Sequence, residues 1–141
     1  MAANTNPIFI KQGNFTPARI TGATVDSSGA TTTNIVTVVT AGADGTRVDG
    51  IRFRNAQVSL AASSAMTHKI WLSNTSGTNY RLVGEVATPA ATRTASAIGA
   101  TSIYTFDQPL IMESGQLLAV GQSVYAGVQD LFDACAFAGD Y

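Results

Sequence analysis

Charged residues are scarce in this chain of 141 residues. Asp, Glu, Lys and Arg together make up 12% of it, about half of the roughly 25% found in an average globular domain. Charged residues are also depleted at the cores of protein interfaces. The low share of charged residues fits a domain whose solvent-exposed faces are made of Thr and Ser. It also fits a subunit whose surface is largely covered by neighbouring subunits.

The chain has one cysteine and one histidine. A single cysteine excludes an intrachain disulfide, and the apolar surroundings of Cys135 predict a buried structural thiol. No G-x-S-x-G motif marks a nucleophile for His68, and metal sites usually use several His and Cys ligands. We therefore predict no catalytic residue, no metal site and no cofactor, and we interpret the protein as a non-enzyme.

Other kinds of site have weak support. Glu85, Asp107 and Glu113 could form a hydrolase pair, but nothing in their neighbourhoods indicates a raised pKa. Glycines at positions 42, 45 and 50 invite a phosphate-loop interpretation, which fails because the lysine and the following helix are missing.

No apolar run approaches the ~20 residues of a membrane span. The first ten residues lack the basic region of a signal peptide, so we expect synthesis in a cytoplasm and no membrane partner. The isoelectric point of about 5.6 argues against direct nucleic-acid binding.

The few charges are unevenly distributed. Residues 1–93 carry all eight Lys and Arg against four acidic residues, whereas residues 94–141 carry five acidic residues and no basic one. Surfaces of opposite sign could steer head-to-tail self-association. The simpler alternative, which we favour, is that strands from both halves interleave and their charges mix.

Short runs rich in Val, Ile and Thr, separated by Gly, Ser and Asn turns, make up most of the chain. They predict an all-β fold, an antiparallel β-sandwich of jelly-roll type with about eight strands. The predicted strands are residues 18–25, 31–40, 47–55, 66–73, 80–87, 101–107, 116–125 and 131–138.

Residues 40–55 hold the most informative local pattern. The pair Asp44-Gly45 suits a tight turn, so we predict a hairpin between the strands on either side of it. The following strand alternates, which places Ile51 and Phe53 in the core and Arg52 and Arg54 on the opposite face. We predict that these two arginines meet an acidic surface on a neighbouring subunit, because the guanidinium group pairs well with carboxylates.

Residues 1–16 show little pattern, and we expect an extended N-terminal arm followed by a single β-sandwich domain over residues 17–141. An extended arm can bind a neighbour through backbone pairing and a few apolar anchors. The predicted anchors are Ile8, Phe9, Ile10 and Phe15.

A resemblance to a known family rests on three segments of the chain and on residues 80–86, which lie between the second and the third. The three segments are residues 2–9 (AANTNPIF), 40–53 (TAGADGTRVDGIRF) and 132–141 (FDACAFAGDY). In this order they resemble small virion structural proteins of tailed bacteriophages. The resemblance implies a non-enzymatic building block of the virion, made in the host cytoplasm. We expect a capsid decoration (cement) protein, which would bind the major capsid protein and further copies of itself as a dimer or trimer.

Two alternatives remain open. One is a tail, collar or fibre-associated subunit with the same fold. The other is a carbohydrate-binding β-sandwich module, for which Trp71, Tyr80 and Tyr104 are the candidate aromatic residues.

Overall fold

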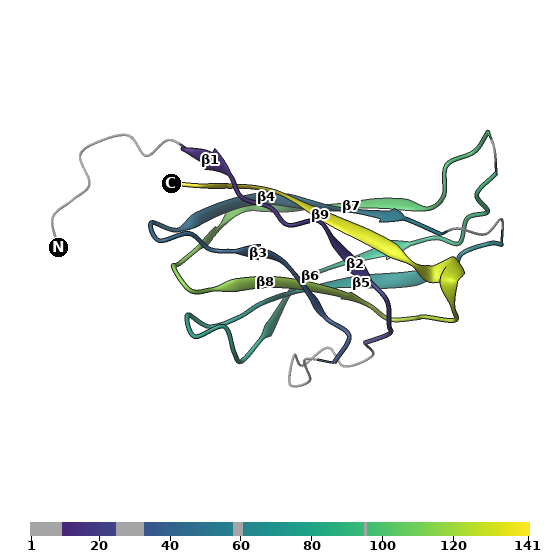
Figure 1. Cartoon of the computed structure of the whole chain (residues 1–141), viewed down its shortest axis with the longest axis horizontal. Helices are drawn as coiled ribbons and strands as arrows, with labels where there is room; N and C mark the ends of the chain where they lie inside the picture. Colours follow the sequence, from purple (N-terminus) through teal and green to yellow (C-terminus); the bar gives the residue numbers. More distant parts are fainter. Residues whose placement is uncertain (1–9, 25–32, 58–60, 95) are drawn as a thin grey trace, which may run out of the picture.

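The computed structural model describes residues 10–24, 33–57, 61–94 and 96–141, and in these residues the chain is built of β-strands (Figure 1). Two antiparallel sheets pack face to face, which confirms the predicted β-sandwich. The strands are β1 (Gln12–Gly13), β2 (Ala18–Ile20), β3 (Val36–Thr40), β4 (Thr46–Asn55), β5 (Met66–Leu72), β6 (Arg81–Thr88), β7 (Thr101–Met112), β8 (Leu117–Gln122) and β9 (Phe132–Asp140), with a 3-10 turn η1 (Val128–Asp130).

The strand order is that of a jelly roll. Sheet A runs β2-β9-β4-β7, with β1 also on β9, and sheet B runs β3-β8-β5-β6. The antiparallel pairs β2–β9, β3–β8, β4–β7 and β5–β6 are nested, so the chain forms one long folded-over ribbon. The predicted jelly-roll type is therefore present, and strands from the basic first part and the acidic last part interleave.

The predicted hairpin at residues 40–55 is wrong in one respect. The turn itself forms, with Gly45 N–H donating to the Gly42 carbonyl at 3.1 Å and Gly45 at φ 97°. However, β3 belongs to sheet B and pairs with β8, whereas β4 belongs to sheet A. The turn is therefore an arch between the two sheets, and each flanking strand pairs with strands from the second half of the chain.

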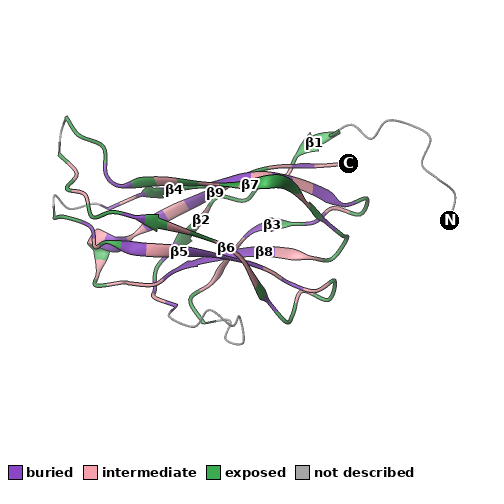
Figure 2. Cartoon of the chain, turned by 180° about the vertical axis from the view of Figure 1, so that it is seen from behind, coloured by how far each residue is buried: buried purple, intermediate pink, exposed green. Residues whose placement is uncertain are grey.

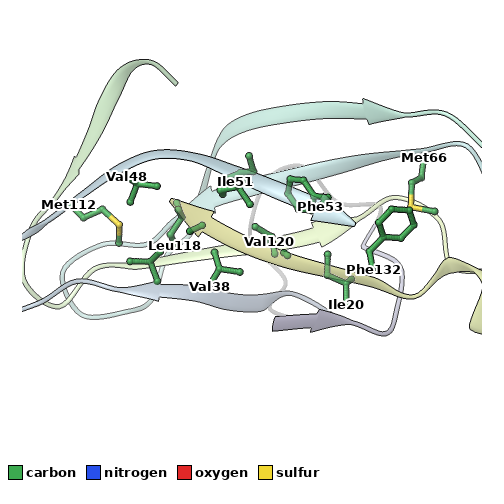
Figure 3. Close-up of a cluster of buried hydrophobic side chains, with 14 of the residues drawn as sticks. Ile20, Val38, Val48, Ile51, Phe53, Met66, Met112, Leu118, Val120 and Phe132 are labelled. Carbon is green, nitrogen blue, oxygen red and sulfur yellow. The ribbon is translucent and has the colours of Figure 1, made fainter. Parts of the chain in front are cut away.

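The core lies between the sheets (Figure 3). Ile51 and Phe53 of β4 are fully buried, as the alternation predicted, and they pack with Phe132 of β9 and Ile70 of β5. A smaller cluster lies on the outer side of sheet B, where Trp71 is fully buried with Tyr80 and Ala119.

The described part of the predicted N-terminal arm pairs with the chain's own body. β1 pairs with the end of β9, and Asn14 N–H donates to the Ala138 carbonyl at 3.0 Å. Two residues later, Thr16 N–H donates to the Val38 carbonyl of β3 at 2.9 Å, so the chain crosses from one sheet to the other. Residues 10–16 thus line one side of the sandwich, and residues 1–9 lie outside the described part.

Candidate interaction face

The outer face of sheet A, the side turned away from the core, brings together residues from four strands. Residues directly opposite each other in antiparallel strands share one face of a sheet. The registers of β7, β4, β9 and β2 therefore align Thr101, Arg54, Asp133 and Arg19 in one row. The neighbouring rows are Ile103, Arg52 and Cys135, then Thr105, Gly50 and Phe137, then Ile111, Arg47 and Gly139.

Large apolar side chains are exposed on this face, which we call the sheet A face. Ile103 and Ile111 on β7 are each 55% exposed, Phe137 on β9 is 44% exposed and Ile10 is 46% exposed. Ile10 lies over Gly139, where a Cβ atom would collide with its side chain. Several large apolar side chains exposed on one face of a sheet are typical of an interaction site.

The two predicted arginines lie among these apolar side chains. Arg52 and Arg54 are exposed, and neither forms an ion pair with any described residue. The acid beside Arg54, Asp133, is already bound by Arg19, with Nε–Oδ1 at 2.7 Å and a second nitrogen on Oδ2 at 3.1 Å. This hydrogen bond and the charge of Asp133 raise the pKa of Arg19. The sheet A face therefore offers two cations that its own acids leave unneutralised.

The centre of the outer face of sheet B is closed by side chains of its own strands, whereas Glu85 and Ala87 on the edge strand β6 are exposed. Trp71 is fully buried there, and Lys69 and Ser73 are also buried. The Trp71 ring lies over Gly121, where an added Cβ would come within 3.1 Å of it. In Figure 2 the edge strand β7 of sheet A is largely green (exposed), and the central strand β5 of sheet B is largely purple and pink. Of the two outer faces, that of sheet A carries the large exposed apolar side chains among the described residues.

Three of the predicted interface residues, Ile10, Arg52 and Arg54, share the sheet A face. Phe15 is 53% exposed but lies at the side of the sandwich, where the chain crosses between the sheets. Ile8 and Phe9 lie outside the described residues. The sequence interpretation missed Ile103, Ile111 and Phe137, although each alternates with inward-facing residues on its strand.

Cys135 corrects a second prediction, because it is half-buried and belongs to the sheet A face. Its neighbours Ala134 and Ala136 point into the core, so the alternation of the strand turns Cys135 outward.

His68 lies in the core between the sheets. Its ring stacks on Phe53 at 4.3 Å and meets Phe132 edge-on, and burial lowers the pKa of His68 to about 3. Nδ1 lies 2.8 Å from the Thr88 hydroxyl, which lies 2.6 Å from the Ser102 hydroxyl. The His68 ring is fully buried and neutral, and a substrate cannot reach it. His68 therefore acts as a structural residue.

The aromatic residues named for sugar binding are not free to stack on a ligand. Trp71 is fully buried and Tyr80 is 7% exposed. Tyr104 is half-buried against Gly84, and its hydroxyl donates to the Val83 carbonyl at 3.4 Å. The carbohydrate-binding alternative therefore loses its three candidate residues.

Within the described residues, no group of three or more His, Cys, Asp or Glu side chains could hold a metal ion. Over the same part of the chain, no helix has the length and apolar character needed to cross a membrane. Comparisons with family models, curated proteins and solved structures found no match to this chain.

Proposed function

We propose that this chain is a structural subunit of a phage particle, a capsid decoration protein that binds the shell through its sheet A face. The observation that carries the proposal is the asymmetry of the sandwich. The centre of its sheet B face is closed by Trp71 and its neighbours, whereas its sheet A face exposes four large apolar residues and two arginines that form no ion pair with any described residue.

The chemistry of the face specifies the partner. Protein interfaces combine an apolar centre with enriched Arg, and a guanidinium group pairs with a carboxylate through two parallel hydrogen bonds. A capsid surface that presents apolar residues beside carboxylates would complement Ile103 and Phe137 together with Arg52 and Arg54. Jelly-roll sandwiches are common in viral capsid proteins and in lectins, and the burial of Trp71 favours the first of these two.

The resemblance also gains a structural context. Two of its segments, residues 40–53 and 132–141, contribute most of the neighbouring strands β4 and β9, and they supply Arg52 and Phe137 to the face. Two of the segments on which the resemblance depends therefore contribute residues to the candidate interface.

Locating the protein in intact particles tests the proposal. Particles of the phage that encodes the chain would be labelled with an antibody against it and examined by electron microscopy. Regular labelling over the shell is expected. Labelling confined to the tail or collar would replace the decoration role by the tail-subunit alternative, and particles without the protein would overturn both.

A further inference from the structure

Strand β7 forms an open edge of sheet A. It pairs with β4 on one side, and within the described residues its backbone forms no hydrogen bond on the other side over residues 101–105. The opposite edge of sheet A is lined by β1 and β2. An unpaired edge can accept a further strand from another chain.

The two halves of β7 differ in how they are protected. Residues 106–109 lie out of register, between Thr105 opposite Gly50 and Leu110 opposite Val48, and they include Asp107 and Pro109. An irregular segment with a charge and a proline blocks strand addition. Residues 101–105 (TSIYT) have no charge, proline or glycine and pair regularly with β4. Residues 110–112 beyond the irregular segment also pair regularly with β4, so residues 101–105 form the longest regular, uncharged stretch of this edge among the described residues.

This stretch of the edge is held rigid from the core side. The Ser102 hydroxyl lies 2.6 Å from the Thr88 hydroxyl on β6, and the Tyr104 hydroxyl donates to the Val83 carbonyl. The Tyr104 ring also packs edge-on against Phe106 at 5.0 Å. A strand that is already ordered loses little conformational freedom when it binds a partner.

The five residues are complementary to themselves. In an antiparallel pair centred on Ile103, Thr101 faces Thr105, Ser102 faces Tyr104 and Ile103 faces its own copy. Threonine pairs and apolar pairs across strands are favourable, and no like charges oppose each other. The two Arg52 side chains would lie three strand spacings apart, about 14 Å, beyond the Debye length at physiological salt.

We propose that two copies of this chain associate through residues 101–105 of β7, antiparallel about a two-fold axis at Ile103. Sheet A then continues through both copies, and both sheet A faces lie on the same side of the dimer, where they form one larger docking surface. A closed two-fold dimer is the commonest symmetric assembly of soluble proteins. The inference does not depend on the proposed function, because it concerns the purified protein alone.

Disulfide cross-linking tests the register directly. Directly opposed residues have Cα atoms about 4.5–5.5 Å apart, within the range of about 4.4–6.8 Å that a disulfide spans. In a Cys135→Ser background, Thr101→Cys mixed with Thr105→Cys is expected to give a disulfide-linked heterodimer under mild oxidation. Thr101→Cys alone is expected to cross-link far less, since its two copies lie about 13 Å apart. Ile111→Cys, equally exposed on the same strand, is the control that stays unlinked.

Sedimentation equilibrium of the chain without added cysteines provides the second measurement. Ile103→Lys places two like charges opposite each other and is expected to weaken the dimer at least ~10-fold. Ile111→Lys adds the same charge outside the paired segment and should leave the dimer intact, and thermal unfolding checks that both variants fold. A protein that is still monomeric at about 100 μM, where even weak dimers form, would overturn the proposal. Cross-linking of Thr101→Cys alone, or of Ile111→Cys, as efficient as that of the mixed pair would overturn it too.

Discussion

Asp133 lies directly opposite Arg54 in the β4–β9 pair, but its carboxylate is bound by Arg19 on β2, the strand on the other side of β9. Asp133 thus provides one negative charge between two arginines, and its strong hydrogen bonds point away from Arg54. This arrangement leaves Arg52 and Arg54 available to acids on another protein.

Removing that negative charge should therefore strengthen binding to an acidic partner. We predict that Asp133→Asn raises the affinity for phage shells about twofold to tenfold, with a larger effect at low salt because exposed charges are less screened there. Co-sedimentation with shells at two salt concentrations measures the change. Asp44→Asn, which breaks the exposed Lys11–Asp44 ion pair near the arch between the sheets, is the matched control and should leave the affinity unchanged. Weaker binding of Asp133→Asn would count against an acidic partner.

The buried His68 makes the fold sensitive to acid. Burial lowers its pKa from 6.5 to about 3, so in the folded protein it resists a proton that the unfolded chain accepts below pH 6.5. Its contribution to stability is complete above pH 6.5 and is lost progressively as the pH falls toward 3. At pH 4.5 the loss amounts to about 2–3 kcal/mol.

A non-titrating variant isolates this effect from that of the carboxylates. Urea unfolding at pH 7 and pH 4.5 should show that the wild-type chain loses about 2–3 kcal/mol more than His68→Gln between the two conditions. Equal losses in both chains would show that His68 is already protonated, or accessible to water, in the folded state.

The carboxylate of Asp140, near the end of β9, connects the N-terminal segment to the arch between the sheets. Its Oδ1 accepts hydrogen bonds from Asn14 Nδ2 and from the Thr46 hydroxyl, each at 2.5 Å. Asp140→Ala removes the acceptor of the buried Thr46 hydroxyl and one acceptor of Asn14 Nδ2, which also donates to the Thr40 carbonyl at 2.7 Å. We therefore expect a loss of about 1–3 kcal/mol in the free energy of unfolding. Asp107→Ala, on the exposed irregular part of β7, should change it by less than about 0.5 kcal/mol.

Hydrogen exchange checks the same prediction locally. The Lys11 and Asn14 amides donate to carbonyls of β9, and both should exchange faster in Asp140→Ala. Unchanged exchange would mean that β1 is held on β9 without the help of this side chain.

The sequence predicted the strands well because their signals are local. The alternation of Ile51 and Phe53 with Arg52 and Arg54 fixes which side chains enter the core. The partners of each strand are not encoded locally. An Asp-Gly turn suits a hairpin and an arch equally, and the choice here depends on β8 and β9, more than 60 residues away.

The same limit applies to the candidate site. Arg52 and Arg54 stand out in the sequence as charges on an alternating strand, but Ile103 and Phe137 become their neighbours only through the pairing of β4 with β7 and β9. The apolar surroundings of Cys135 predict a core position, whereas its position in the alternation of β9 places it on the outer face of sheet A.

Charge reversal at the two arginines tests the central claim most directly. The double variant Arg52→Glu/Arg54→Glu would be compared with Arg81→Glu, an exposed arginine on β6 of the other sheet, for binding to phage shells. The account predicts that the double variant unfolds like the wild type but binds shells at least ~10-fold more weakly, and that Arg81→Glu binds normally. Full binding by the double variant would contradict it and would reduce these arginines to a solvated surface.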